Sequence, residues 1–316
     1  MGSVTRILRR KAPSRVTLFA VSKPFRGQIG VIQRNAIGSW LRLGPNCEVV
    51  LFGDEEGTDE AARELGVRHV PTVVRNEFGT PLLSSVFDQA GALAKEGTLC
   101  YVNSDIVLLD DFVPALRRVQ ARRSRYLMIG QCWDSTLDWT VDFDDGRWRD
   151  RLRELVATTE RTRGRWSIDY FAFPSGLYGE VPPFAIGRGW FDNWLVCRAR
   201  ELGAAVVDAT SAVTAIHQRH DYAHVSGGQD GAYRGPEATE NLRIGGGHGH
   251  VESTRDAAYV LTRRRFRRRS SPLTFDYHWE RWLRPVVWAV YAITRPIRHR
   301  LGIRAGMFDA LRSRLR

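Results

Sequence analysis

Short apolar runs and amphipathic segments alternate along the first 110 residues of the chain. Residues 16–21 (VTLFAV) and 48–52 (EVVLF) are apolar, β-rich runs that predict buried strands. Between them, apolar residues recur at helical spacing over residues 28–43, and Gly44 and Pro45 stop that helix. Strands that alternate with helices in this way predict a mainly parallel sheet, covered by helices on both faces. Further along, the pattern predicts a helix at 58–65, a strand at 67–70, a helix at 84–95 and a strand at 99–102.

The second half of the chain is less regular. An aromatic and acidic stretch at residues 133–150 leads into a charged helix near 147–160, and residues 217–250 are rich in glycine and histidine. No internal repeat interrupts this order. The remaining apolar segments predict a strand at 169–173, a helix at 192–202 and a strand at 212–216.

Basic residues are concentrated at one end of the chain. The 316 residues have an ordinary hydrophobic content of 43% and charged content of 26%, but a net charge of +12. Residues 263–316 hold 15 of the 47 Lys+Arg residues and three acidic residues, whereas the rest of the chain is balanced. We therefore expect a neutral α/β domain at residues 16–262, a basic arm at 1–15 and a basic amphipathic helical tail at 263–316. A neutral domain with one basic end indicates attachment to a surface more than a nucleic-acid-binding domain.

The four cysteines, Cys47, Cys100, Cys132 and Cys197, are far apart and mostly lie in apolar contexts. Their spacing fits neither a zinc site nor a disulfide framework, and it predicts reduced thiols in a cytoplasmic protein. The apolar run behind the basic arm is too short for a signal peptide, and no run reaches the roughly 20 residues of a membrane span.

A polar triplet, Asn103-Ser104-Asp105, separates two apolar runs in the stretch CYVNSDIVLLDDF. In parallel sheets, ligands bind at the carboxyl ends of the strands, and a carboxylate held there can bind Mg²⁺ or Mn²⁺ beside a diphosphate. The alternative is an aspartate in a turn or at a helix cap, and the triplet by itself does not decide between the two.

Two later segments carry further candidate chemistry. Asp192 stands at the predicted start of a helix, where a carboxylate serves either as a helix cap or as a general base. His217 follows the predicted strand 212–216 and is a candidate metal ligand. The pair His217 and His220 is spaced like half of a zinc site, but no Cys or Glu stands at a matching distance along the chain.

Taken together, these motifs resemble those of glycosyltransferases of the GT-A fold, which use nucleotide sugars. The resemblance covers about residues 15–262 and is carried by TLFAVSKPF, YVNSDIVLLDDF, DYFAFP, PPFAIGRGWFDNWLV and AIHQRHDY. In that family a strand ends in a DXD-type motif, matched here by residues 103–105. An x-Glu-Asp motif precedes a helix with a downstream Leu and Arg, matched by Phe191 and Asp192 with Leu195 and Arg198. The sequence departs from both motifs, with Asn103 for the first Asp and Phe191 for the Glu.

The resemblance implies transfer of a sugar, hexosyltransferase-like, from a UDP- or GDP-sugar to a sugar or lipid-linked acceptor, aided by Mn²⁺ or Mg²⁺. It implies that Asp105 and His217 bind the metal and that Asp192 is the general base of an inverting reaction. Around the donor, it implies contacts from Ser22, Lys23, Asp54, Asn103, Ser104 and Asp105.

Three residues are candidates for contacts with the acceptor sugar. Trp133 can stack on an apolar sugar face, and Asp134 and Asp169 can bind sugar hydroxyls. For each of them, packing or turn formation is the alternative role.

The basic tail combines arginines with tryptophans. A dense cationic run, TRRRFRRRS, is followed by an apolar, Trp-rich segment that is too short to span a bilayer. Such a segment can lie on an anionic membrane surface, which predicts a peripheral membrane protein. Packing against the domain and binding to nucleic acid are the alternatives.

Two other functions remain open at this stage. A nucleotidyltransferase shares the nucleotide-binding half of this fold, but it usually has a Gly-rich phosphate loop where this chain has SKPFRG. A non-catalytic sugar- or lipid-binding module on a degenerate GT-A scaffold would explain both departures from the family motifs.

Overall fold

The computed structural model describes residues 15–159, 162–220, 227–269, 289 and 293. Within them, one large sheet with nine strands forms the centre of the molecule, in the order β12-β11-β9-β6-β8-β4-β1-β2-β3. All its neighbouring strands pair in parallel except at β8, which runs antiparallel to β4 and β6, and at the edge strand β12. The strands are β1 (Val16–Val21), β2 (Cys47–Phe52), β3 (Arg68–Val70), β4 (Thr98–Val102), β6 (Tyr126–Ile129), β8 (Tyr170–Pro174), β9 (Ala205–Ser211), β11 (Tyr259–Thr262) and β12 (Phe266–Arg268).

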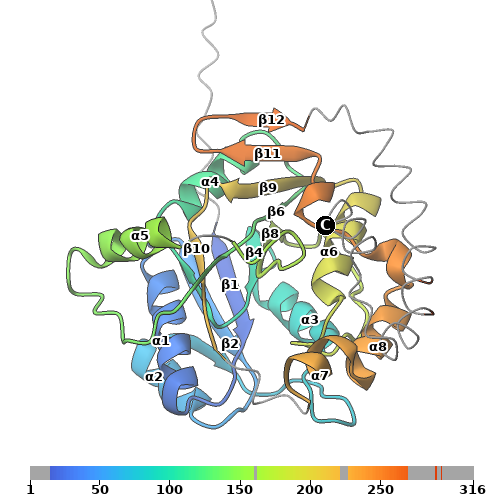
Figure 1. Ribbon diagram of the computed structural model, residues 1–316, viewed down its shortest axis with the longest axis horizontal. Helices are drawn as coiled ribbons and strands as arrows, with labels where there is room; N and C mark the ends of the chain where they lie inside the picture. Colours follow the sequence, from blue (N-terminus) through green and yellow to red (C-terminus); the bar gives the residue numbers. More distant parts are fainter. Residues whose placement is uncertain (1–14, 160–161, 221–226, 270–288, 290–292, 294–316) are drawn as a thin grey trace, which may run out of the picture.

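Helices cover both faces of this sheet. Helices α1 (Gly27–Leu41), α2 (Thr58–Leu65) and α4 (Phe112–Gln120) pack on one face, and α3 (Leu83–Leu93) and α6 (Phe191–Glu201) pack on the other. Figure 1 shows α1 and α2 on one side of β1 and β2, with α3 and α6 on the opposite side. The predicted α/β class, with a mainly parallel sheet between two helical layers, is confirmed.

Strand β1 shows how the sequence produces the two layers. Its alternate residues Leu18 and Ala20 belong to the apolar cluster around α1 and α4, while Phe19 belongs to the cluster around α3 and α6. Side chains of a strand point to opposite faces in turn, so a strand that is apolar at every position needs cover on both sides.

A second sheet with three strands lies over α1. Strand β10 (Ala215–Gln218) pairs antiparallel with β5 (Ile106–Leu108) and parallel with β7 (Trp133–Ser135). The buried Trp40 indole donates a hydrogen bond of 2.8 Å to the Ile106 carbonyl, and the Leu108 amide donates one of 3.1 Å to the Ser39 hydroxyl. These bonds attach the small sheet to α1, directly beside the chain segment that follows β4.

The remaining described elements lie around this framework. Helix α5 (Trp148–Thr158) packs its apolar side with β5 and β10, and two short helices, α7 (Gly228–Arg234) and α8 (Pro236–Ile244), contact each other. Short 3-10 turns follow at His248–His250 and Thr254–Asp256.

Two expectations from the sequence do not agree with this fold. Of the strand predicted at 212–216, only residues 215 and 216 lie in a strand, β10, and residues 212–214 form the turn that follows β9, because the Ala212 and Val213 amides bond back to the Ala209 carbonyl. The boundary predicted after residue 262 falls inside a hairpin, in which β12 pairs antiparallel with β11, so residues up to Arg268 belong to the sheet. The rest of the predicted helical tail, apart from residues 289 and 293, and most of the N-terminal arm lie outside the described residues. No helix in the described part of the chain combines the length and apolar character needed to cross a membrane.

Candidate active site

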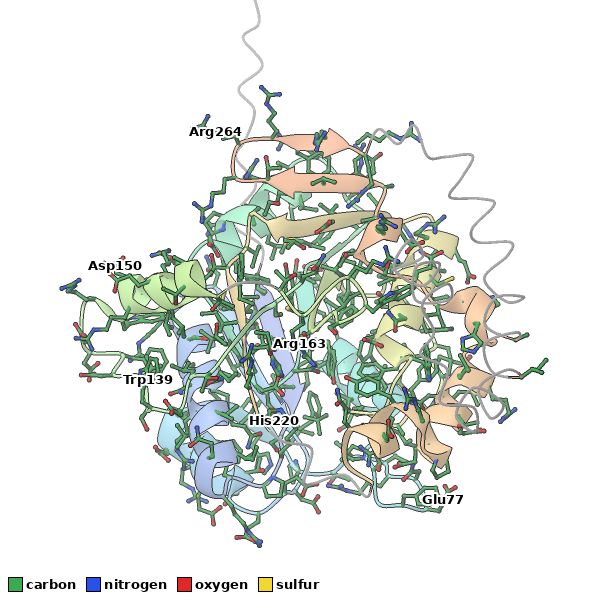
Figure 2. All side chains as sticks on the ribbon, in the orientation of Figure 1. Glu77, Trp139, Asp150, Arg163, His220 and Arg264 are labelled. Carbon is green, nitrogen blue, oxygen red and sulfur yellow. The ribbon has the colours of Figure 1, made fainter. Side chains whose placement is uncertain are left out.

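Strand pairing brings the predicted polar positions to one edge of the sheet. Strands β2 and β4 both pair in parallel with β1, so their carboxyl ends lie together. Lys23, Asp54 and Asp105 each follow one of these ends. Figure 2 shows His220 and Arg163, which contact this edge, in the middle of the molecule, while Glu77, Trp139, Asp150 and Arg264 lie at its periphery.

The carboxylate of Asp105 is buried, with 7% of the residue exposed. Its Oδ2 atom lies 3.3 Å from Lys23 Nζ and 3.0 Å from His220 Nε2. Its Oδ1 atom is buried and has no hydrogen-bond partner. Burial opposes ionisation, but the Lys23 ammonium and the hydrogen bond from His220 outweigh it and hold the pKa of Asp105 well below the ordinary value. A buried carboxylate with a vacant oxygen is a strong candidate ligand, because leaving such an atom unpaired is costly.

His217 is oriented by its neighbour in the small sheet. It stands opposite Asp134 in the register of β10 and β7, and its Nδ1 lies 2.9 Å from Asp134 Oδ1. A carboxylate only accepts, so Nδ1 carries the proton and Nε2 of the neutral ring keeps its lone pair. The second oxygen of Asp134 accepts a hydrogen bond of 3.0 Å from Arg219. The pKa of Asp134 is lowered to about 2, mainly by the hydrogen bond from His217.

Asp105, His217 and His220 together offer three ligand atoms within 4.8 Å of one another. The antiparallel register that pairs His217 with Ile106 brings both histidines to Asp105. The sequence prediction joined Asp105 with His217 but found no partner for His220, since that partner lies 115 residues away along the chain. One carboxylate and two imidazoles form a ligand set that suits Mn²⁺, Fe²⁺ or Zn²⁺.

A second carboxylate, Asp169, lies beside this group. Its Oδ1 accepts from Asn103 Nδ2 at 3.1 Å and from Arg163 Nη1 at 2.9 Å, while its Oδ2 is buried without a hydrogen-bond partner. The backbone N–H of Asn103 also donates a hydrogen bond of 3.0 Å to the backbone carbonyl of Asp169. Asn103, the departure from the DXD pattern, therefore holds Asp169. No sequence motif singles out Arg163.

Asp192 lies in the first turn of α6. The residue before the helix, Trp190, has a φ of 86°, a left-handed conformation that is strained for a residue other than glycine. Its ring stands edge to face with His248, with the centroids 5.3 Å apart. Burial, and to a lesser extent the charge of Asp169, raise the pKa of Asp192 to about 7. Phe191, where the family has Glu, packs its ring against Tyr101 at a centroid distance of 6.1 Å.

Tyr101 connects the three carboxylates. Burial raises the pKa of its phenol, and the charges of Asp105, Asp192 and Asp169 raise it further, in that order. The three carboxylates therefore act electrostatically on one buried side chain of β4, which relates the candidate base to the candidate metal ligands.

Buried side-chain amides of α1 and β10 support the site from behind. The Gln218 side-chain nitrogen donates to the carbonyls of Asp105 and Ile32 at 3.1 and 2.8 Å, and its oxygen accepts from Asn35 at 3.1 Å. Gln33 makes two bonds of 2.8 Å, one with the amide and one with the carbonyl of Lys23. The sequence pattern marks Gln33 and Asn35 only as polar positions in a helix and Gln218 only as a residue after an apolar run, so the sequence did not reveal these bonds.

Other predicted residues have contacts of their own. The Ser22 hydroxyl lies 2.9 Å from that of Thr58. Asp54 is exposed and pairs with Arg75 at 2.6 Å, and this hydrogen bond lowers its pKa. Ser104 is buried, and Trp133 is half-buried next to Asp134. The described contacts do not join Ser22 or Asp54 to the group around Asp105.

No family model matches the chain, and no curated protein matches it. Among solved structures, a mannosyltransferase from Pyrobaculum calidifontis in complex with GDP-Man and Mn²⁺ is 14% identical, with a TM-score of 0.39, over 63% of this chain and 55% of that enzyme. Glucosyl-3-phosphoglycerate synthase from Mycobacterium tuberculosis, in complex with Mn²⁺, UDP and glucosyl-3-phosphoglycerate, is 18% identical, with a TM-score of 0.42, over 66% and 74% of the two chains. TarS of S. aureus is 14% identical, with a TM-score of 0.29, over 38% of this chain and 22% of TarS. The first two of these structures contain a nucleotide or nucleotide sugar together with Mn²⁺, but at TM-scores below 0.5 the likeness by itself identifies no activity.

Proposed function

We propose that the chain is a glycosyltransferase that moves a sugar from a nucleotide-diphosphate donor to a hydroxyl of an acceptor. The observation that carries the proposal is the group of Asp105, His217 and His220 at the carboxyl edge of the sheet, with a buried and unpaired Asp105 oxygen. The motifs shared with GT-A glycosyltransferases lie at this same edge and give the group its proposed chemistry.

Asp105, His217 and His220 would hold a divalent cation. Such an ion supplies positive charge that stabilises the leaving diphosphate. Two of the three ligands are imidazole nitrogens, and Mg²⁺ prefers oxygen ligands in a strict octahedron. Of the two ions that the sequence implied, we therefore infer Mn²⁺ in preference to Mg²⁺.

Asp192 is proposed as the general base. A carboxyl group with a pKa of about 7 exists in both protonation states near neutral pH, and its basic form can take the proton from an acceptor hydroxyl. One base and a direct displacement imply inversion at the anomeric carbon. Retention of configuration in an isolated product would reject this part of the proposal.

The surrounding residues suggest how the two substrates bind. Asp169 presents an unpaired oxygen to an acceptor hydroxyl, while Asn103 and Arg163 hold the carboxylate in place. Trp133 is proposed to stack on the acceptor. Asp134 has both oxygens engaged by His217 and Arg219, so we now propose a supporting role for it in place of the acceptor contact. The nucleotide is proposed to bind beyond β1 and β2, near Ser22, Ser104 and the Asp54–Arg75 pair.

Calorimetry with UDP and GDP, each with and without Mn²⁺, tests the proposal. The variant is Asp105→Asn, which keeps the shape and removes the charge, and the matched control is Asp88→Asn on the exposed side of α3. We expect Mn²⁺-dependent binding of one nucleotide in the wild type and in the control, and a loss of at least about tenfold in Asp105→Asn.

Three outcomes would contradict the proposal. Failure of UDP and GDP to bind under any condition would favour a non-catalytic scaffold. Tight binding of Fe²⁺ or Zn²⁺ without nucleotide binding would favour a different metal chemistry on the same three ligands. Release of pyrophosphate from a nucleoside triphosphate and a sugar phosphate would instead indicate a nucleotidyltransferase.

We also propose that the arginine-rich end of the sheet contacts an anionic membrane surface. Two segments meet there: residues 117–125 contain five arginines, residues 263–269 contain six, and neither contains an acidic residue. Arg118 donates to the carbonyls of Thr262 and Arg263 at 2.8 and 3.0 Å, which joins the two segments. Arg269 pairs with Asp208, and no other arginine of the two segments forms an ion pair among the described residues.

Sedimentation with vesicles tests the membrane contact. Binding is expected with phosphatidylglycerol and not with phosphatidylcholine, with weakening at high salt and in the double variant Arg264→Glu/Arg267→Glu. Arg63→Glu, at the exposed end of α2, is the control. Equal binding to both lipids, or a preference for DNA over vesicles, would overturn the proposal.

A further inference from the structure

The Lys23 ammonium lies at the position where two of the candidate metal ligands meet. Its Nζ atom is 3.3 Å from Asp105 Oδ2 and 3.1 Å from His220 Nε2, and these two atoms are 3.0 Å apart. We infer that Lys23 is an internal cation that occupies the metal centre until a divalent ion displaces it, and that the displaced ammonium then binds the diphosphate of the nucleotide. The inference rests on the proposed function for its metal and its nucleotide.

The type of residue at this position supports the inference. Of the 47 Lys+Arg residues only three are lysines, at positions 11, 23 and 95, so the chain uses arginine almost everywhere else. An ammonium is a compact point charge on a flexible stem, whereas a guanidinium is planar and extended. A lysine is therefore the cationic side chain that best occupies, and can later leave, a site with the size of a metal ion.

The hydrogen bonds around His220 also favour displacement. An ammonium only donates and a carboxylate only accepts, so the single Nε2 atom can accept from Lys23 or donate to Asp105 but cannot do both. One of the three contacts in the triangle is therefore always unfavourable. A divalent cation in place of the ammonium would let Nε2 and Oδ2 face the same positive charge with their lone pairs. The ammonium and the ion cannot share the position, because they repel each other.

The backbone of Lys23 is held by α1, whereas its side chain is partly exposed to solvent. Gln33, which is fully buried, bonds the Lys23 amide and carbonyl at 2.8 Å each, so the loop after β1 stays attached to α1. The Lys23 side chain is 25% exposed, so part of it already contacts solvent. Displacement therefore needs only rotations within one side chain.

Binding of Mn²⁺ alone, followed by the electron paramagnetic resonance signal of free Mn²⁺, tests the inference. Lys23→Met removes the charge and retains much of the stem, and Lys95→Met, at an exposed position outside the site, is the matched control. We expect the variant to bind Mn²⁺ at least about tenfold more tightly than the wild type and the control. At saturating Mn²⁺, we expect the same variant to bind the preferred nucleotide, UDP or GDP, about tenfold more weakly.

The opposite signs of the two effects identify the role. A lysine that merely stabilises the local structure would, when removed, weaken both kinds of binding, and that result would overturn the inference. Unchanged Mn²⁺ affinity in Lys23→Met would also overturn it, while leaving the metal site intact. Absence of Mn²⁺ binding in every protein tested would instead reject the metal centre of the proposed function, and this inference with it.

Discussion

Replacing Asp192 by Asn should make the protein more stable at alkaline pH while it removes the proposed base. In the folded chain, burial raises the pKa of Asp192 from 3.8 to about 7. Between these two pH values the unfolded chain ionises the carboxyl group, whereas the folded chain keeps its proton. The folded state then binds more protons than the unfolded state, so stability falls as the pH rises through this window. Below pH 4 the group is protonated in both states and contributes nothing.

The size of the effect follows from the difference between the two pKa values. About three pKa units at 1.36 kcal/mol per unit give about 4 kcal/mol of lost stability above pH 7. The Asp192 side chain keeps some contact with solvent, and water screens part of this cost, so about 2 kcal/mol is the expected value. An asparagine has the same shape and no charge at any pH, so Asp192→Asn should recover this energy.

Urea denaturation between pH 4.5 and 8.5 measures the difference. The variant and the wild type should differ little at the acid end, and the variant should gain about 2 kcal/mol at the alkaline end. Asp150→Asn, in the exposed first turn of α5, is the control and should show no such trend. A constant difference across the pH range, or a variant less stable than the wild type at pH 8.5, would refute the idea that this carboxylate is desolvated.

Three further predictions concern the support of the site and the core. Asp134→Asn should weaken Mn²⁺ binding about 10- to 100-fold by calorimetry, because the histidine ligand loses its charged partner; unchanged affinity would contradict this role. Arg163→Ala should lower the free energy of unfolding by about 3–5 kcal/mol in urea, since it leaves the buried Asp169 carboxylate without its cation; a loss below 1 kcal/mol would contradict it. Gly130→Ala should lower the free energy of unfolding by about 1–3 kcal/mol, because its added methyl group would overlap a buried tyrosine hydroxyl on β8. Gly91→Ala, in open space on α3, should raise the free energy of unfolding by up to about 1 kcal/mol. Equal effects of the two substitutions in urea denaturation would show that crowding does not decide them.

The first part of the fold could be predicted because its signals are local. The helix at 58–65 was predicted to the residue, since Gly57 and Gly66 bound it and both adopt left-handed φ values. The corner between β9 and β10 could not be predicted in this way. Residues 212–216 are almost uniformly apolar, and a change of sheet within such a run leaves no trace in hydrophobic periodicity.

The candidate site could likewise be proposed from the sequence only where its signals are local. Asp105 was proposed as a ligand because it is a carboxylate just after a buried strand. The pairing of His217 with Asp134 depends on the register of two distant strands, and the sequence suggested a sugar contact for Asp134 instead. His220 lacked a visible partner for the same reason. Residues whose roles follow from strand register become evident only when the strands are placed.

The three-stranded sheet also has a consequence for the order in which the protein matures. It unites segments at 106–108, 133–135 and 215–218, and it closes when the Gln218 amide reaches the Asp105 carbonyl. A nascent chain that has emerged from the ribosome only as far as β9 can already pair β1, β2 and β4, but it cannot yet assemble the three ligands. The proposed Mn²⁺ site should therefore form abruptly during synthesis, when the long-range pairing of β10 with β5 and β7 is completed. Affinity for this ion would then report that the three-stranded sheet of a newly made chain has closed.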